Sequence, residues 1–276
     1  MDIRVATFRI TSRCTHSCEY CFAPKHVPEM DFLKLRQVFD IFVKAGVQNV
    51  LLTGGEPSLR DDFAKIVEEL KSRGLGIFLD TCGDLFFKYA DAISQSVSIL
   101  GLPIDWVGGG YRGADNFERV LEILTYYKRK EQRPGIRIGT VVTRDNLASL
   151  VEIGELISYF PVFAWKLYQF TPQEVSAIKN RRLLEVSEEI FGEATKNVKA
   201  RFSPRLEVII SKRADRNLAY LFIESDGRVV VPVDNMDICR LETVGSIFDE
   251  DIFQRWMAQV NLRNYMRNLE PTFNIK

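Results

Sequence analysis

Short β-branched runs alternate with amphipathic helical patterns from residue 4 to about residue 170 of this 276-residue chain. The first run, residues 4–10, leads into a cysteine-rich loop. The first helical pattern then begins at a capping Asp31 and ends at Gly46. Apolar side chains recur on one face of this pattern, and we expect that face to be buried. These side chains are Phe32, Leu35, Phe39, Phe42 and Val43.

The same β-then-α pattern repeats along this part of the chain. The expected strands are residues 4–10, 49–53, 76–80, 97–102, 136–142 and 163–170. The later helices are expected at residues 63–73, 85–94, 116–130 and 146–159. Because a helix returns the chain to a parallel strand by a right-handed crossover, this order predicts an α/β fold, a partial (β/α)6 TIM-like barrel. In such barrels the chemistry lies at the carboxyl ends of the strands.

The pattern changes after residue 173. The expected elements there are a helix at residues 184–198, a strand at 206–210, a hairpin of 220–224 with 228–231, and a helix at 249–260. The residues beyond 260 give no clear pattern. We expect residues 1–173 to form the barrel core. Residues 174–276 should form a C-terminal β-hairpin and helix extension that caps the barrel and is not an independent domain.

Composition narrows the class of protein. Lysine and arginine (37) balance aspartate and glutamate (37), so no global positive field favours a nucleic acid polymer or an anionic membrane. No apolar run reaches the roughly 20 residues of a membrane span, and Asp2 and Arg4 open the chain where a signal peptide would be apolar. We therefore expect a cytoplasmic protein with a small-molecule or peptide substrate.

Three of the five cysteines lie in one loop, as Cys14, Cys18 and Cys21. Three thiolates at this spacing can bind three irons of a cubane cluster and leave the fourth iron open. A structural zinc site with His16 or Cys82 as fourth ligand is the alternative, although zinc sites usually combine two separated ligand pairs. A zinc-stabilised binding protein and a cluster that only carries electrons therefore remain alternative functions.

A second motif, Gly54-Gly55-Glu56-Pro57, follows the second strand. Two glycines leave the backbone at the strand end bare enough to approach a ligand, and Glu56 supplies an acceptor for an ammonium group. By the barrel rule this motif and the cysteine loop meet at one mouth.

With Tyr20 directly before the third cysteine, the two motifs resemble those of the radical S-adenosylmethionine (SAM) superfamily. The resemblance implies a [4Fe-4S] cluster on Cys14, Cys18 and Cys21, whose open iron is chelated by SAM. Reductive cleavage of SAM would yield a 5′-deoxyadenosyl radical that abstracts hydrogen from the substrate. An electron donor such as flavodoxin or ferredoxin is implied as a partner.

The resemblance also implies SAM-binding residues beyond the cysteine loop. Arg112 would pair with the methionine carboxylate, and Asn146 would reach the adenosyl part or cap a helix. Thr81 precedes a position where the family often has asparagine and this chain has Cys82. The full implied set is Gly54, Gly55, Glu56, Pro57, Thr81, Arg112 and Asn146.

Candidate substrate residues lie on the fourth to sixth strands. Asp105 ends the fourth strand and could bind a substrate hydroxyl, act as a base, or hold a turn. Alternation places Lys166 and Tyr168 on one face of the sixth strand. If that face is interior, Lys166 and Arg137 form a cationic lining; otherwise the face is exposed or pairs with outer helices.

Within the superfamily the chain most resembles viperin and its prokaryotic relatives. The shared positions are Trp165, Lys166, Gln169, Tyr220, Leu221 and Ile223, whereas Arg137 and Gly139 depart from that pattern. The hairpin also resembles SPASM and twitch extensions, but Cys239 alone is too little for a second cluster. A nucleotide, nucleoside or sugar substrate is favoured over a peptide, with a viperin-like nucleotide dehydratase and a peptide-modifying enzyme as alternatives.

Overall fold

The computed structural model describes residues 3–203 and 205–273. One sheet of ten strands, in the order β10-β9-β8-β1-β2-β3-β4-β5-β6-β7, runs through it. The strands are β1 (Val5–Thr11), β2 (Asn49–Gly54), β3 (Gly76–Asp80), β4 (Ile99–Pro103), β5 (Gly135–Val142), β6 (Val162–Gln169), β7 (Glu207–Ser211), β8 (Phe222–Ile223), β9 (Arg228–Asp234) and β10 (Cys239–Ser246).

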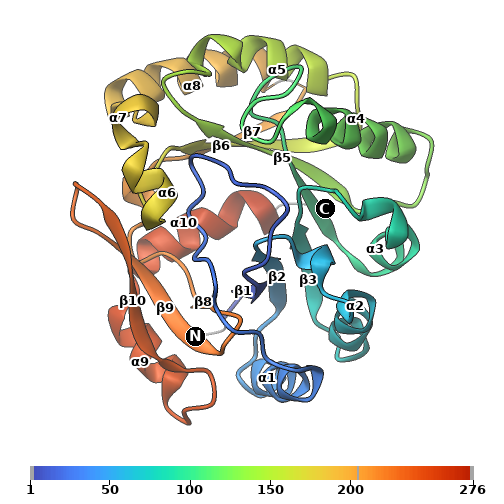
Figure 1. Cartoon of the computed structure of the whole chain (residues 1–276), viewed down its shortest axis with the longest axis vertical. Helices are drawn as coiled ribbons and strands as arrows, with labels where there is room; N and C mark the ends of the chain where they lie inside the picture. Colours follow the sequence, from blue (N-terminus) through green and yellow to red (C-terminus); the bar gives the residue numbers. More distant parts are fainter. Residues whose placement is uncertain (1–2, 204, 274–276) are drawn as a thin grey trace.

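Helices cover the outer face of this curved sheet (Figure 1). The α-helices are α1 (Phe32–Lys44), α2 (Phe63–Ser72), α3 (Ala90–Ser96), α4 (Ala114–Lys128), α5 (Leu150–Ile157), α6 (Glu174–Lys179), α7 (Arg181–Leu184), α8 (Glu188–Phe202), α9 (Ile252–Gln259) and α10 (Leu262–Phe273). Four short 3-10 turns join them, namely η1 (Pro57–Leu59), η2 (Phe86–Lys88), η3 (Leu147–Ser149) and η4 (Ala214–Arg216).

The predicted partial barrel is confirmed, and the sheet remains open between its edge strands β7 and β10. The six expected strands all form, and each pairs in parallel with its neighbour in sequence order. The loop between β1 and α1 crosses the open mouth (Figure 1). The carboxyl ends of the strands therefore converge as expected.

The segment after residue 173 extends this sheet at both of its ends. β7 pairs in parallel with β6, and β8 pairs in parallel with β1. β9 and β10 then follow antiparallel, so the predicted hairpin forms and gains a third strand. These pairings support our proposal that residues 174–276 are not an independent domain, and they show that the segment continues the sheet as well as capping it.

Some helical predictions need correction. Val43 is 46% exposed because its neighbours Phe39 and Phe42 already fill the face against the sheet. The helices expected at residues 85–94 and 146–159 each begin as a separate 3-10 turn, η2 and η3. The helix expected at residues 184–198 is α8, which begins after a Ser187 N-cap whose side chain accepts from the Ile190 N–H.

The helix α10, which no clear sequence pattern predicts, covers the amino end of the sheet. The Tyr265 hydroxyl accepts a hydrogen bond from the Val5 N–H at 3.1 Å and lies 3.3 Å from the Val5 carbonyl oxygen. Tyr265 also packs edge-on against Trp256 of α9. The end of the sheet opposite the cysteine loop is therefore covered by α10.

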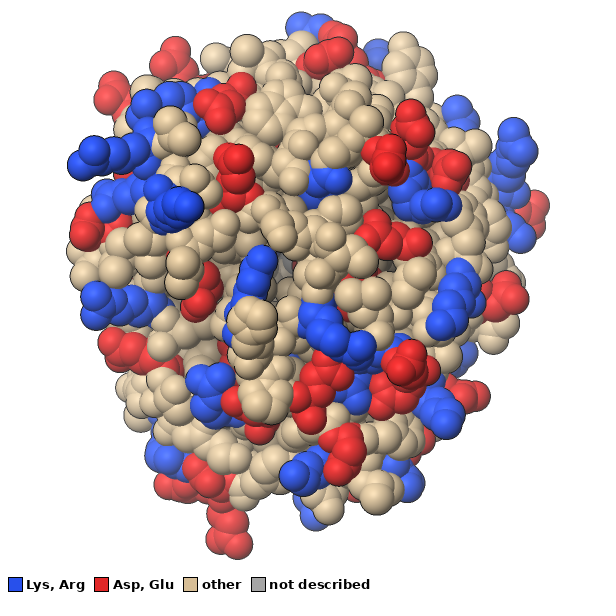
Figure 2. Space-filling model, viewed as in Figure 1, with Lys and Arg blue, Asp and Glu red and all other residues tan. Residues whose placement is uncertain are grey.

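No helix in residues 3–203 and 205–273 combines the length and the apolar character that crossing a bilayer requires. Basic and acidic side chains are interspersed on the face in Figure 2. This distribution agrees with the balanced charge of the sequence.

Candidate active site

A cavity of about 320 Å³ joins the cysteine loop to the interior of the sheet. Cys14, Cys18 and Cys21 all line it, as free thiols that are respectively exposed, buried and half-buried. Burial raises the pKa of Cys18 to about 11 and also raises the pKa of Cys14. Cys14 and Cys18 are therefore neutral at pH 7 in the free protein, and a metal must displace their protons.

The spacing of these thiols discriminates between the two metal sites. Three thiolates on one tetrahedral zinc would have their sulfurs about 3.8 Å apart, given a Zn–S bond of about 2.3 Å. The three Sγ atoms do not all lie within 4.8 Å of one another, whereas ligand atoms of His16, Cys82 and Asp84 do. A wider separation suits a cubane, in which each thiolate binds a different iron.

The proposed zinc ligands His16 and Cys82 lie beside Asp84 at the end of β3. His16 Nε2 is 3.0 Å from Asp84 Oδ2, and the Thr15 hydroxyl also donates to that carboxylate. These contacts fasten the tip of the cysteine loop to the β3 end. His16 therefore has a hydrogen-bonding role in the loop.

Gly54 and Gly55 are required by the close approach of β2 to the cysteine loop. A Cβ at Gly54 would overlap the Thr11 carbonyl oxygen, and one at Gly55 would overlap the Arg13 carbonyl oxygen. The Gly55 N–H donates to Thr11 at 2.8 Å, and the next N–H, of Glu56, donates to Arg13 at 2.7 Å. The bare backbone that we expected to face a ligand thus also positions the root of the loop.

Glu56 is fully buried and does not line the cavity. Its carboxylate accepts hydrogen bonds from the Ser58 N–H at 3.0 Å, the Thr81 hydroxyl at 2.6 Å and the Cys82 N–H at 2.7 Å. Pro57, also buried, begins the turn η1. In the free protein Glu56 therefore joins the ends of β2 and β3, and binding of the SAM ammonium by Glu56 remains a prediction.

Arg112 faces the cavity and is held by Asp105. Arg112 Nη1 donates to Asp105 Oδ2 at 2.7 Å, and the Tyr20 hydroxyl donates to the same oxygen at 2.5 Å. The Val141 N–H donates to Asp105 Oδ1 at 3.0 Å. Burial raises the pKa of Tyr20, which keeps the phenol protonated as a donor. Asp105 thus links the cysteine loop to Arg112.

Asn146 and Thr81 are placed differently. Thr81 lines the cavity, but Asn146 is fully buried outside it. The Asn146 amide donates to the carbonyl oxygens of Asp105 and Val141, and its Oδ1 accepts from the Thr143 N–H. Asn146 makes no side-chain cap bond to η3, so its observed role is to fasten the loop after β5.

The substrate candidates on β5 and β6 meet in the cavity. Arg137, Lys166 and Tyr168 all line it, so of the two faces that the sequence left open these residues lie on the interior one. Arg137 pairs with Asp80, and Lys166 Nζ lies 5.1 Å from the centre of the Tyr168 ring. Burial and the nearby Arg137 lower the pKa of Lys166 to about 7.

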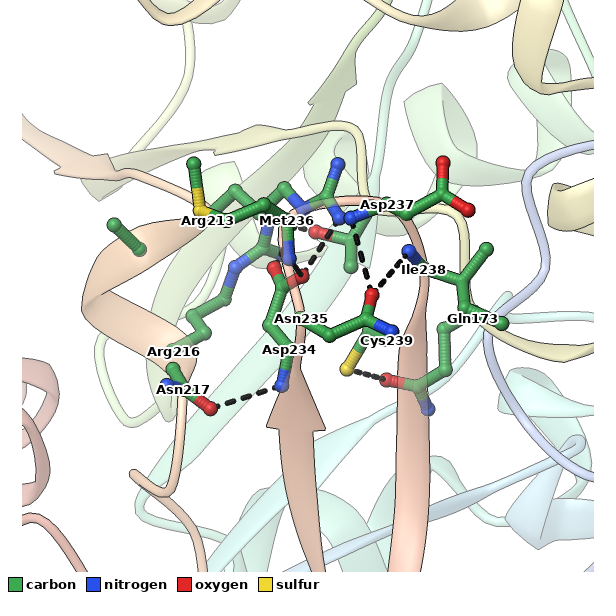
Figure 3. A network of polar contacts seen from close by, with 12 residues as sticks. Gln173, Arg213, Arg216, Asn217, Asp234, Asn235, Met236, Asp237, Ile238 and Cys239 are labelled. Atoms are coloured by element: carbon green, nitrogen blue, oxygen red, sulfur yellow. Dashed lines mark hydrogen bonds and ion pairs between the residues drawn. The ribbon is translucent and has the colours of Figure 1, made fainter.

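The cavity lining also includes four residues that the sequence did not single out, and these belong to the polar network in Figure 3: Arg213, Arg216, Asn217 and Asp234. Arg213 forms a two-point ion pair with Asp234, whose N–H donates to the Asn217 side chain at 2.9 Å. Cys239 donates to Gln173 at 3.3 Å. Tyr220 and Gln169 also line the cavity. No local pattern marks Arg213, Arg216, Asn217 and Asp234, because they reach the cavity through strand pairings: β7 pairs with β6, and β8 joins β9 to the distant β1.

Comparison with known proteins identifies the family. The family model described as the radical SAM superfamily matches residues 8–157. The chain belongs to the radical SAM superfamily. Radical SAM enzymes use an iron–sulfur cluster and SAM, so the predicted cofactors and the enzymatic nature of the protein are confirmed at the level of the family.

Curated relatives of this radical SAM protein have diverse activities. An "AdoMet-dependent heme synthase" of Nitratidesulfovibrio vulgaris is 24% identical over 76% of this chain and 62% of its own length. A second heme synthase, from Oleidesulfovibrio alaskensis, is matched over 46% of its length, so the chain spans about half of these relatives. An "S-adenosylmethionine-dependent nucleotide dehydratase" of Selenomonas ruminantium is 21% identical over 90% of this chain and 92% of its length.

Solved structures confirm the radical SAM fold. The structure "Native anSMEcpe with bound AdoMet and Cp18Cys peptide" matches 96% of this chain and 84% of its own with a TM-score of 0.69 and 17% identity. The AdoMet-bound Streptococcus suis SuiB structure matches 83% of this chain and 60% of its own, with a TM-score of 0.67 and 13% identity. At these identities the likeness is one of fold.

Proposed function

We propose that this radical SAM enzyme abstracts hydrogen from a small organic substrate bound in the cavity that the cysteine loop and the inner strands share. One observation carries the proposal: Cys14, Cys18 and Cys21 line the same 320 Å³ space as Arg137, Lys166 and Tyr168. Such a volume is at the small end of the range for small-molecule sites. A small molecule, such as a nucleotide, nucleoside or sugar, is therefore favoured over a peptide.

In this proposal, residues at one end of the cavity bind the cluster and SAM, and residues at the other end bind the substrate. When bound, the reduced cluster and SAM supply reductive cleavage of the sulfonium and the radical that removes hydrogen. Cys14, Cys18 and Cys21 would hold the cluster, and Arg112 would bind the SAM carboxylate. Asp105 and Tyr20 fix the direction of the Arg112 guanidinium.

The inner end would bind substrate through Arg137, Lys166 and Tyr168, which extend from β5 and β6. Burial of Lys166, at 6% exposed, means that little water competes with a ligand there. The helix α10 covers this end through Tyr265, which lines the cavity. A substrate would thus be oriented by polar contacts and shielded from bulk solvent, which protects a reactive intermediate.

A nucleotide dehydratase of the viperin type is the second candidate. The Selenomonas relative named as a nucleotide dehydratase matches this chain over nearly its whole length, unlike the longer heme synthases. The cationic residues of the inner end suit a charged substrate. We infer a cytoplasmic setting with flavodoxin or ferredoxin as reductant, because the cluster must receive electrons.

Anaerobic reconstitution tests the proposal. Protein loaded with iron and sulfide, then treated with dithionite and SAM, should form 5′-deoxyadenosine. Replacing Cys18 with alanine should abolish that product, whereas Cys239→Ala should not remove the cluster. A panel of deuterated nucleotides, nucleosides, sugars and peptides then identifies the substrate by deuterium transfer into 5′-deoxyadenosine. A colourless protein with one tightly bound zinc and no cleavage of SAM would refute the proposal.

A further inference from the structure

Ion pairs neutralise only part of the charge in the cavity. Six lysine and arginine side chains line it, against three aspartates. Three ion pairs form between them, namely Arg112 with Asp105, Arg137 with Asp80 and Arg213 with Asp234. The cations without a carboxylate partner among the described residues are Lys25, Lys166 and Arg216.

Lys25 lies at the exposed surface, so water can solvate it, whereas Lys166 is buried and lines the cavity. Lys166 is 94% buried, and its amino group has no hydrogen-bond acceptor within the described part of the chain. The Lys166 amino group lies over the face of the Tyr168 ring. A buried ammonium without an acceptor is costly in a free protein, which indicates a site built for a ligand.

Arg216, on the turn η4 that follows β7, presents a similar deficit. Its Nη2 donates to the Gln169 carbonyl and the Thr171 hydroxyl, which are both neutral. Its Nε is shielded from solvent and finds no acceptor in residues 3–203 and 205–269. The guanidinium carbon lies 6.0 Å from the Tyr168 ring, the same ring that Lys166 contacts. Two uncompensated cations therefore adjoin one aromatic side chain.

We infer that Lys166 and Arg216 bind a doubly charged anionic group of the substrate, of the phosphoryl class. Two cations without partners call for two negative charges, which one carboxylate does not supply. Phosphoryl oxygens also accept several hydrogen bonds, which suits an ammonium and a guanidinium. The inference rests on the proposal that this cavity holds the substrate, and it adds Arg216, which the strand pattern could not reveal.

The network in Figure 3 positions Arg216 for this role. Arg213, three residues earlier, is fixed by Asp234 at 2.5 and 2.7 Å, and it closes the turn η4 that carries Arg216. Asn217 is fixed by the N–H of Asp234. The turn is thus held on both sides of Arg216 by the end of β9, so little ordering is needed when an anion binds.

Sulfate tests the inference, because it is a tetrahedral dianion whose charge is constant between pH 6 and 9. Binding is measured by calorimetry on the full chain without cluster or SAM, with acetate as the singly charged comparison. Wild-type protein should bind sulfate, and acetate at least ten times more weakly. Lys166→Met and Arg216→Met should each weaken sulfate binding at least tenfold. Lys212→Met, which removes a surface lysine paired with Glu188, should leave it unchanged.

The pH dependence separates a direct role of Lys166 from a structural one. The charged groups that face Lys166 are Asp80, Arg137 and Arg216, and the Tyr168 phenol adjoins them. Since the pKa of Lys166 is lowered to about 7, sulfate affinity should fall from pH 7 to 9 as the ammonium loses its proton. Lys166→Arg, which stays charged, should retain the affinity over that range.

Unchanged sulfate binding in Lys166→Met and Arg216→Met would overturn the inference, as would equal affinity for acetate. Failure of the proposed function is recognised separately. In that case the reconstituted wild-type protein forms no 5′-deoxyadenosine, whereas the sulfate titration is carried out without cluster or SAM. The two proposals therefore fail in different experiments.

Discussion

At the scale of single residues, Asp105 determines where Arg112 points. One of its oxygens accepts from both Arg112 and Tyr20, and the other accepts from the Val141 N–H. We therefore propose that Asp105, for which the sequence left a substrate contact, a base or a turn role open, positions Arg112 for SAM. Glu56 also binds protein groups in the free protein, since its carboxylate oxygens accept hydrogen bonds from protein donors.

Asp105→Asn should therefore weaken SAM binding without removing the cluster. Loss of the charge that orients Arg112 is expected to weaken binding about tenfold, equivalent to roughly 1.4 kcal/mol. Calorimetry with SAM, together with iron content per chain, checks this prediction. Asp40→Asn, which alters an exposed ion pair with Arg73, serves as the control. An unaltered dissociation constant would exclude a positioning role for Asp105.

The buried Lys166 should lower the unfolding free energy of the ligand-free protein. Its pKa is about 7 in the folded chain against an ordinary 10.5, so the unfolded chain binds more protons between these values. Unfolding free energy should therefore rise from pH 7 toward 10.5. At pH 7, Lys166→Met should have an unfolding free energy higher than that of wild type, by on the order of a few kcal/mol. This difference between the two proteins should shrink as pH rises.

Urea titrations of both proteins at pH 7 and pH 9.5 measure this difference. Lys212→Met, at an exposed site, should show the wild-type dependence on pH. If Lys166→Met were less stable than wild type at pH 7, burial of an uncompensated ammonium would be the wrong description of this residue.

At the scale of elements, the β2 end and the cysteine loop form one joint. Gly55→Ala must push its Cβ against the Arg13 carbonyl, which a backbone shift alone can relieve. We expect a loss of about 1–3 kcal/mol in unfolding free energy and a lower iron content after reconstitution. Gly192→Ala in α8 is the matched control, because its Cβ would have no neighbour within 4 Å. That control should gain roughly 0.5–1 kcal/mol. Equal iron content in both variants would contradict the proposal that the end of β2 positions the cysteine loop.

The success of prediction also differs by element. Six strands were predictable because each is a local β-branched run, and strand order follows from crossover handedness. The end of β1 then placed Cys14 at the mouth, and alternation placed Lys166 and Tyr168 on one face of β6, although it could not decide that this face is interior. Arg216 was not predictable, since the turn η4 reaches the cavity through the pairing of β7 with β6, from which it is separated in the sequence by the helices α6 to α8. Pairing over such distances leaves no periodic signal in the chain.

At the scale of the whole molecule, the two halves of the chain share one sheet. Because β7 and β8 pair with opposite members of the barrel core, we expect a single cooperative unfolding transition. Trp165 lies in β6 and Trp256 lies in α9, and both are fully buried. Because the chain also contains Trp106, the double variants Trp106→Phe/Trp165→Phe and Trp106→Phe/Trp256→Phe each leave a single tryptophan as reporter. Their fluorescence midpoints should each match the midpoint from circular dichroism of the same variant, and separate midpoints would show independent halves.

The place of β1 between β2 and β8 has a consequence for biosynthesis. A ribosome delivers β1 first among the strands, yet one of its two neighbours follows after 200 further residues have been translated. The cysteines that follow β1 are therefore synthesised long before the sheet around β1 is complete. We expect iron and sulfide to be bound most efficiently by Cys14, Cys18 and Cys21 after β8 has been translated, because β1 can then pair with both of its neighbouring strands.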